Sequence, residues 1–529
     1  MYSVEALYKK CPNLWVSVNS YKNWGYAEDD LATGHPICKQ APHTDSADDM
    51  INGITYGKGC SFLKQLFHLI GYEAFSLATK IYFDKYQWKN TELNDFLECL
   101  DEAYDKCPKK TENIVVSEWA KTFLNTRGAN TFEGVLKTDQ LVVTQEVSQY
   151  SDGLRTQKVD VTLFDEKFDQ TIESFMTSEE EKETVVKLAP GKHKYYILNH
   201  GDHAYGKIII DEATSEFLSK NLSSVKESLT RAIVWKGIQG MVKVCKIKST
   251  KYFEFVQNNL PSEDQTALFE TVVQTAGMLI GAYIPDQKFE ETCSTMFKFF
   301  YELLIKEKRD KVVPTLSNAL FNFLHTVEDT ETAMGWIEGG NVTDKSGNKI
   351  EGAVLSKNNK FSIVQSAYAK ESIELKVKEE LLEKVLGDDK SDIANNLRLT
   401  CKTLLPDAKS KEEAWAEISD HSNTLSSYER NAMMAGFFNR ESAEILKPYY
   451  DQYVKKVEES ATCGNKEFMV AFIRGSCPGF NITDEFIESL KKVVAQFSDD
   501  VQHDSFCRSL NQVIESLEIN KKIKDFASA

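Results

Sequence analysis

The spacing of apolar residues changes twice along this chain, and that change is the strongest constraint on its fold. Residues 1–130 carry apolar side chains at steps of three and four, which is typical of amphipathic helices. Between residues 131 and 211 the step becomes two, as at Val159 and Val161, which predicts strands of a half-buried sheet. From residue 212 to 529 the helical spacing returns. The sequence therefore predicts a mainly α protein with one small β domain, divided at these boundaries.

The turns predicted within the two later segments indicate how each of them folds. Within residues 131–211 the apolar runs are separated by Ser151-Asp152-Gly153, Pro190-Gly191 and Asn199-His200-Gly201-Asp202, which favours a small β-sandwich. Within residues 212–529 short polar turns interrupt one helical stripe after another. That arrangement is typical of stacked helix pairs, so we expect an α-helical solenoid there, although no strict repeat period is present.

One stretch of the first segment carries a chemical argument. Phe62, Leu63, Leu66, Phe67 and Ile70 form one face of a helix that Gly71 is expected to end. At the entrance of this helix, glycines 57 and 59 flank Lys58 and permit a sharp turn that would leave Tyr56 projecting. A phenol is protonated at neutral pH and can donate a hydrogen bond to an oxyanion. Most tyrosines simply pack, and the alternative reading of Tyr56 is packing.

The sequence motifs around Tyr56 resemble the tyrosine segment of the aminopeptidase N family of zinc peptidases, the gluzincins. The similarity includes His35-Pro36-Ile37, Gly53-Ile54-Thr55-Tyr56-Gly57-Lys58-Gly59, Asn90-Thr91-Glu92-Leu93, Trp119-Ala120-Lys121-Thr122-Phe123-Leu124 and Gly128-Ala129-Asn130-Thr131. The resemblance implies that residues 1–130 are the helical C-terminal part of a thermolysin-like catalytic domain. It also implies that the chain removes N-terminal residues from peptides, and that Tyr56 helps to stabilise the tetrahedral intermediate.

The zinc motif of that family is absent from this sequence. The family binds zinc through His-Glu-x-x-His on a helix, with the glutamate as general base. None of the 9 histidines here is followed by glutamate. We therefore predict no metal ligand and no cofactor in this chain, with Tyr56 as its one catalytic residue. The resemblance places the chain downstream of the metal, as a C-terminal portion that is inactive alone.

Two functions remain open from the sequence. In the first, the chain is part of an aminopeptidase, and a missing N-terminal half or a partner chain covers the face of the Tyr56 helix and completes a site for peptide substrates. In the second, the chain is a non-catalytic peptide-binding or scaffold protein derived from that family. An uncovered apolar patch larger than about 300–600 Å² on the Tyr56 helix would favour the first.

Charge and cysteine content exclude other classes of function. The net charge of −17 disfavours nucleic-acid and anionic-membrane partners. No apolar run approaches the ~18–20 residues of a membrane span, and no signal peptide opens the chain. Its 11 cysteines show no paired spacing, which suits reduced thiols, so we expect a cytoplasmic protein.

Three histidines lie close together in the predicted β domain. His193, His200 and His203 fall in or beside turns, and a metal site is one interpretation of them. Turn histidines are more often solvated, which is the interpretation we favour.

Overall fold

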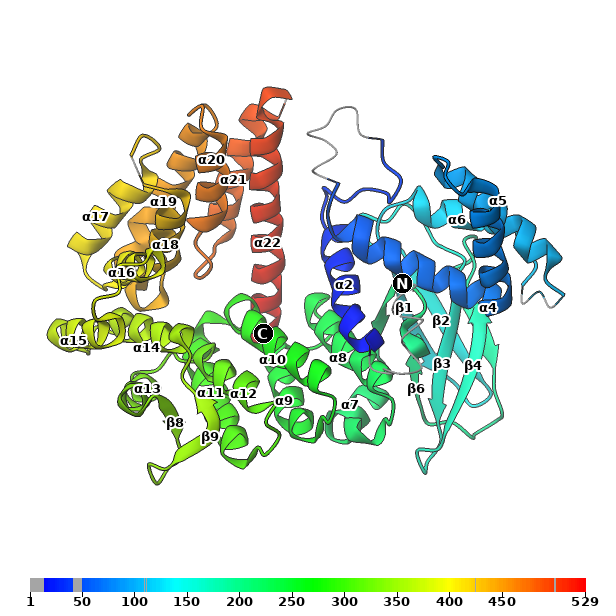
Figure 1. The fold of residues 1–529 in the computed structure, drawn as a ribbon, viewed down its shortest axis with the longest axis horizontal. Coiled ribbons are helices and arrows are strands. Elements are labelled where there is room, and N and C mark those ends of the chain that lie inside the picture. The colour runs from blue at the N-terminus through cyan, green and yellow to red at the C-terminus, as the bar shows by residue number, and fades with distance from the viewer. Residues whose placement is uncertain (1–13, 41–49, 109, 111, 424, 499–500) are drawn as a thin grey trace. The chain divides into compact units, whose positions relative to one another are not determined.

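The computed structural model describes residues 14–40, 50–108, 110, 112–423, 425–498 and 501–529. Residues 1–13 and 41–49 of the predicted first segment lie outside this range. The fold is mainly helical with small sheets, as the sequence predicts (Figure 1). It separates into two compact units, one of residues 1–246 with 258–268 and one of residues 247–257 with 269–529.

The first unit opens with helices. They are α2 (Leu14–Asp29), the π-helical turn η1 (Ile54–Lys58), α4 (Gly59–Tyr86), α5 (Leu93–Lys106) and α6 (Val116–Leu124). Gly71 takes the non-helical backbone expected of it, with φ of 80° and ψ of 166°, so the first helical stretch of α4 ends there and a second one follows across a kink to Tyr86. Although residues 1–130 were expected to be mainly helical, the sequence analysis identified no individual helix at α2, whose apolar residues are interrupted by Asn19, Lys22 and Gly25.

Helices α4, α5 and α6 share one core. Phe62 and Leu66 of α4 pack with Leu100 of α5 and with Trp119 and Phe123 of α6. On the predicted apolar face of α4, Phe62, Leu66 and Ile70 are buried, and Leu63 and Phe67 are partly buried against the same cluster. Neighbouring helices of the chain itself therefore cover most of this face, so the uncovered apolar patch that would favour a missing half is not found on it.

Seven strands follow. They are β1 (Asn130–Leu136), β2 (Gln140–Glu146), β3 (Lys158–Phe164), β4 (Gln170–Met176), β5 (Glu183–Lys187), β6 (Tyr195–Leu198) and β7 (Gly206–Ile209). One sheet has the order β5-β2-β1-β7 and the other β4-β3-β6; β1 and β7 run parallel, and the other pairs are antiparallel. Tyr196 of β6 donates a hydrogen bond to the Gly134 carbonyl of β1 at 2.5 Å. A Cβ at Gly134 would lie 2.7 Å from the Tyr196 ring, so this bond between the sheets requires glycine.

Two helices, α7 (Glu212–Asn221) and α8 (Ser228–Lys243), complete most of the first unit. The Arg231 guanidinium of α8 is buried and pairs with the buried Glu263 carboxylate at 2.7 Å. This pair ties α8 to the 258–268 segment, which explains why that segment belongs to this unit despite its position in the sequence.

The second unit is helical apart from one hairpin. Its helices are α9 (Ser249–Asn259), α10 (Thr266–Tyr283), α11 (Phe289–Lys306), α12 (Val313–Phe321), α13 (Val327–Gly339), α14 (Lys357–Ala369), α15 (Leu375–Leu386), α16 (Asp392–Leu404), α17 (Ala408–Ser419), α18 (Ser427–Phe437), α19 (Ala443–Ser460), α20 (Lys466–Gly475), α21 (Asp484–Phe497) and α22 (Asp504–Ser528). Strands β8 (Asn341–Thr343) and β9 (Lys349–Val354) form the hairpin, which the sequence analysis did not predict.

Helices that lie two apart in the sequence pack on each other through much of this unit. Helix α14 packs on α16, α16 on α18, α18 on α20, and α20 on α22. A single apolar cluster joins the last six helices; Trp415, Phe437, Tyr453, Phe472 and Leu510 are among its buried members. The unit is thus built from local helix contacts around a continuous core.

The structure also describes the membrane-spanning potential of the helices and the state of the cysteines. Among the described helices, none combines the length and the apolar character that crossing a bilayer requires. The cysteines of the described residues are all free thiols.

Candidate functional site

The Tyr56 segment is held by a close crossing of two helices. A Cβ at Gly57 would lie 2.1 Å from the Tyr21 carbonyl oxygen, and one at Gly53 would lie 2.5 Å from that of Trp24. From the other side, a Cβ at Gly25 would lie 2.9 Å from the Lys58 nitrogen. The glycines therefore allow the backbones of α2 and η1 to touch. The sharp turn predicted at Gly57 and Gly59 is not present, because η1 runs directly into α4.

Tyr56 itself projects from η1 as predicted. Its side chain is 54% exposed, and its ring stacks on Trp24 with centroids 6.3 Å apart and planes 7° apart. The amide of Tyr56 donates to the Asn52 carbonyl at 3.2 Å, and the Asn52 side-chain oxygen accepts from the Ile54 amide at 3.0 Å. The start of η1 is thus capped, and the phenol is left on the surface with one aromatic neighbour.

Asn52 also connects this segment to His35. The Asn52 amide nitrogen lies 2.9 Å from His35 Nε2, and His35 Nδ1 lies 2.7 Å from the Pro36 carbonyl oxygen. Since an amide nitrogen can only donate and a carbonyl can only accept, the proton of His35 is assigned to Nδ1. The His35-Pro36 segment therefore helps to position the turn that carries Tyr56.

Directly after Tyr56 and Gly57, Lys58 turns inward and is fully buried. Its ammonium pairs with the buried Asp29 carboxylate at 3.0 Å and donates to the Thr126 carbonyl at 3.0 Å. Asp29 in turn accepts from the Tyr205 hydroxyl and from the Gly128 amide, both at 3.0 Å. Burial lowers the pKa of Lys58 to about 8, and the neighbouring Asp29 opposes that shift.

A buried arginine extends this network. Arg155 donates to the Thr126 hydroxyl at 2.8 Å, to the Arg127 carbonyl at 2.9 Å and to the Asn130 side chain at 3.2 Å. Two segments that lie far apart in the sequence, around residue 58 and at residues 126–130, are therefore joined by this hydrogen-bond network. Asp29 and Arg155 were missed at the sequence level, because isolated charged residues carry no periodic signal.

The three histidines of the β domain do not come together. His200 pairs with Glu227 at 3.4 Å, and its Nδ1 lies 2.9 Å from the Thr162 hydroxyl. His193 lies in the turn before β6, where burial and then Lys192 lower its pKa. His203 instead stacks on His68 of α4, with centroids 3.9 Å apart. The metal site considered for these three histidines is thus not formed by them together, and His203 instead lies with residues of other elements.

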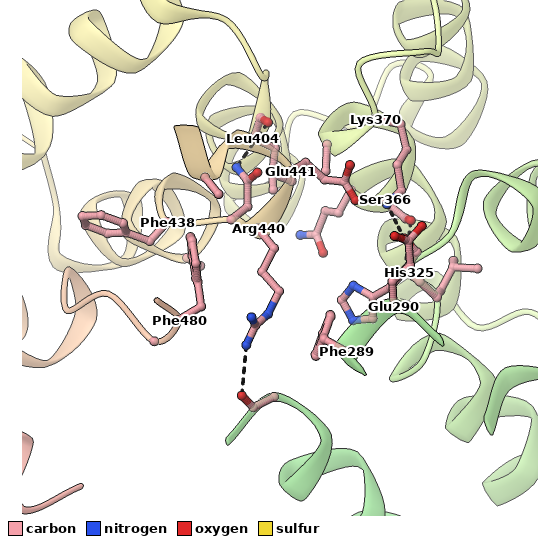
Figure 2. Close-up of a pocket in the computed structure, with 18 of the residues that line it drawn as sticks. Phe289, Glu290, His325, Ser366, Lys370, Leu404, Phe438, Arg440, Glu441 and Phe480 are labelled. Atoms are coloured by element: carbon pink, nitrogen blue, oxygen red, sulfur yellow. Dashed lines mark hydrogen bonds and ion pairs between the residues drawn. The ribbon is translucent and has the colours of Figure 1, made fainter. Parts of the chain in front are cut away.

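The second unit contains a pocket of its own, about 800 Å³ in volume, with Phe289, Phe438 and Phe480 among its lining residues (Figure 2). Arg440 projects between Phe480 and Phe289, 5.2 Å and 4.1 Å from their ring centroids, and ion-pairs with Asp286. This volume lies within the ~300–1,000 Å³ usual for ligand pockets.

The charged groups of this pocket are paired at its wall. Lys370 donates to the His325 carbonyl and to the Glu441 carboxylate. Burial, together with Lys370 and Arg440, lowers the pKa of His325 to about 4, so its ring is neutral. Glu290 is exposed at the rim. The pocket therefore offers aromatic surface and a neutral imidazole, and two of its charged pairs, Lys370–Glu441 and Arg440–Asp286, are formed within its wall.

Two known sequence families match this chain. Residues 195–519 match the sequence model of the ERAP1-like C-terminal domain, and residues 2–119 match that of the peptidase family M1 domain. This chain belongs to the aminopeptidase N family.

Curated relatives give the same family. Aminopeptidase N of Streptomyces lividans is 22% identical over 506 residues, which cover 90% of this chain and 56% of the relative. Human glutamyl aminopeptidase is 32% identical over 101 residues, which cover 19% of this chain and 11% of the relative. Aminopeptidase M1-A of Oryza sativa is 28% identical over 153 residues, or 28% of this chain and 16% of the relative. The chain thus spans about half of the length of the Streptomyces relative.

Proposed function

We propose that this family member acts as the C-terminal portion of a zinc aminopeptidase that removes N-terminal residues from peptides, with Tyr56 donating a hydrogen bond to the oxyanion. The observation that supports this role is the presentation of Tyr56: its ring is half-exposed, while Ile54, Gly57 and Lys58 of the same turn are buried. A rigid turn that exposes one phenol is a suitable hydrogen-bond donor, because little reorganisation is needed when charge develops.

The residues of this chain do not fit the catalytic zinc of the family. No His-Glu-x-x-His occurs in the sequence, and zinc with its general base would supply the activated water. We therefore propose that the metal-bearing segment is provided by another part of the protein or by a partner chain, and that this chain alone is inactive.

Because the face of α4 is already covered, the proposed partner would instead cover an exposed apolar cluster beside Tyr56. Tyr21 and Trp24 of α2 and Ile51 before η1 are 56%, 40% and 62% exposed. Tyr21 and Trp24 are also the residues whose backbones contact Gly57 and Gly53. A segment packed on this cluster would bring its metal site next to the Tyr56 phenol.

Three finer features belong to the same proposal. We propose that the first helices form the helical half of a thermolysin-like domain, that the two facing sheets form a β-sandwich, and that residues 212–529 form an α-solenoid. The sequential contacts of α14, α16, α18, α20 and α22 support the solenoid. The free cysteines support a cytoplasmic location.

The test combines this chain with the N-terminal half of the Streptomyces relative, expressed separately and loaded with zinc. Release of an N-terminal amino acid is expected from the mixture and from neither part alone. Tyr56→Phe should lower kcat by about 10²–10³-fold with little change in KM, since it removes one oxyanion donor. Tyr72→Phe is the control, because Tyr72 is also exposed (70%) and lies on α4. Equal kcat for both variants would remove Tyr56 from the chemistry.

The pocket of the second unit favours the alternative function, a non-catalytic peptide-binding protein. Its aromatic lining and neutral imidazole suit an apolar peptide side chain. Ala435→Trp, at an exposed lining position, should fill the pocket and abolish binding of a fluorescent peptide library. Ala495→Trp, exposed on α21 outside the pocket, is the matched control. Equal peptide binding by the two variants would reject the pocket as the binding site.

A further inference from the structure

Three potential metal ligands from separate elements meet in the first unit. They are His68 of α4, Asp160 of β3 and His203, which follows the short helical turn at 200–202. Each offers one ligand atom, and the three atoms lie within 4.8 Å of one another. His68 Nε2 and Asp160 Oδ1 are 3.2 Å apart. Ligand atoms bound at about 2.0–2.1 Å around a tetrahedral ion lie roughly 3.3 Å apart, so this pair already has the spacing of a coordination site.

The chemical state of His203 suits a ligand. Its Nδ1 is buried and makes no hydrogen bond. An unpartnered buried nitrogen of this kind costs free energy unless something binds it. Burial, then the charge of Lys64, lowers the pKa of His203 well below 6.5, so the ring is neutral at pH 7. A neutral imidazole with a free lone pair is the form that binds metal ions.

Asp160 supplies the negative charge of the group. It is buried on β3, and it accepts hydrogen bonds from the Ser174 hydroxyl at 2.6 Å and from His68. Burial would raise its pKa, but the bonds from His68 and Ser174 prevail and lower it. The carboxylate is therefore ionised at pH 7, and its orientation is fixed by Ser174, as second-sphere partners of metal ligands commonly do.

The surrounding charges neither exclude nor attract a dication strongly. Lys64 donates to the Gly201 carbonyl at 2.7 Å, and Lys22 pairs with Asp202 at 2.6 Å. These two cations balance the two carboxylates, Asp160 and Asp202. The affinity would thus come from direct coordination by two imidazoles and one carboxylate.

We propose that His68, Asp160 and His203 bind a divalent transition-metal ion, for which Zn²⁺ is the natural test ion, with water completing the coordination. Two imidazoles and one carboxylate form a ligand set that such ions prefer to Mg²⁺ or Ca²⁺. The bound ion would join α4 to β3 and to the turn before β7. This site is independent of the proposed peptidase function.

Binding requires His68 Nε2 to release the proton that it donates to Asp160, either to solvent or by a shift to Nδ1, and it requires one local change of shape. The two rings are parallel to within 7°, whereas a metal ion lies in the plane of each imidazole that binds it. One ring must therefore tilt, and the ligand atoms, which lie within 4.8 Å of one another, must come to roughly 3.3 Å apart to reach bonding distance. His203 lies in a turn and His68 on a helix, so we expect His203 to move.

Isothermal titration of the chelator-treated full chain with Zn²⁺ tests the proposal. One ion should bind per chain, and Co²⁺ in its place should give the visible absorption of a four-coordinate centre. His203→Phe keeps the ring stack but removes a ligand, and Asp160→Asn keeps the shape but removes the charge. Each should weaken binding at least ~10–100-fold. His193→Phe, in the turn before β6, should bind as the wild type does.

A second measurement needs no peptidase activity. Free Zn²⁺ at 100 times its Kd should raise the ratio of folded to unfolded wild-type chain about 100-fold, seen as an upward shift of Tm. The shift should be absent in His203→Phe, whose folding is checked by circular dichroism. Absence of binding by the wild type, or wild-type affinity in both His203→Phe and Asp160→Asn, would overturn the proposal.

Discussion

The buried pair Lys58–Asp29 gives a prediction whose sign and size follow from one pKa. The ammonium of Lys58 is fully buried, and its pKa is lowered from 10.5 to about 8. Because the folded-state value lies below the unfolded one, the unfolded chain binds more protons between these values, and stability rises with pH there. Holding Lys58 charged at neutral pH costs roughly 3 kcal/mol, even with Asp29 beside it.

Asp29→Asn removes the carboxylate that keeps this lysine protonated. The pKa of Lys58 should then fall well below 8, and the folded variant should release the proton that the folded wild type keeps. The resulting loss of stability is expected to be near zero at pH 9, about 1.4 kcal/mol at pH 7 and about 2.7 kcal/mol at pH 6. To this is added a pH-independent loss for the weakened bonds to the Tyr205 hydroxyl and the Gly128 amide, each worth about 0.5–1.5 kcal/mol.

Hydrogen exchange read by mass spectrometry measures this locally. Amides of α2 and η1 report the opening of the crossing that buries Lys58, without assuming that the whole chain unfolds in one step. Asp152→Asn is the control: Asp152 pairs with Arg127 at 3.1 Å on the surface, where both side chains are more than one-third exposed, so it should lose less than about 1 kcal/mol. A defect of Asp29→Asn that is equal at pH 6 and pH 9 would refute the reasoning, because Lys58 would then keep its proton without a partner.

Three further variants test packing and burial. Gly57→Ala should open the α2–η1 crossing and lower the free energy of unfolding by about 3 kcal/mol or more through overpacking. Gly59→Ala is the control, because its Cβ would have its nearest neighbour at 3.9 Å, and it should be neutral or slightly stabilising. Thermal melts of the two variants test this difference. Leu66→Ala, in the core of the first unit, should lower the free energy of unfolding by about 2–5 kcal/mol in urea titrations. Burial lowers the pKa of Lys411 to about 7, so the wild type should gain roughly 3 kcal/mol relative to Lys411→Met between pH 7 and 10, measured by exchange in α17 and α18. A flat difference would show that Lys411 reaches water.

Residue spacing predicted the secondary structure well wherever one face of an element is buried. Phe62, Leu66 and Ile70 pointed to α4, and Val159 and Val161 to β3, because one side of each element packs on the core. The same reasoning missed α2. That helix buries Lys22 and Asp29 along with its apolar residues, so its buried face shows no continuous apolar spacing in the sequence.

The candidate sites were less predictable because they depend on contacts between distant residues. His203 lies near His200 in sequence, but its ring stacks on His68, 135 positions earlier in the chain, and Asp160 joins them from a strand. Lys58 finds its partner in Asp29, which no motif marks. Only Tyr56 was found from its local sequence, through the resemblance of its flanks, and its catalytic role stays a prediction.

Packing explains nearly every residue of the Gly53–Gly59 stretch, and this makes the remaining one informative. Gly53 and Gly57 permit two backbones to touch, Ile54 is buried, and Lys58 anchors a buried network. Thr55 donates to the Met50 carbonyl at 2.5 Å and so closes the turn. Tyr56 is half-exposed and contributes only a stack on Trp24, which a phenylalanine could also make. Among the side chains of this stretch that carry a polar group, Thr55 and Lys58 have structural bonds, and the hydroxyl of Tyr56 is the group that we propose for the chemistry and test by Tyr56→Phe.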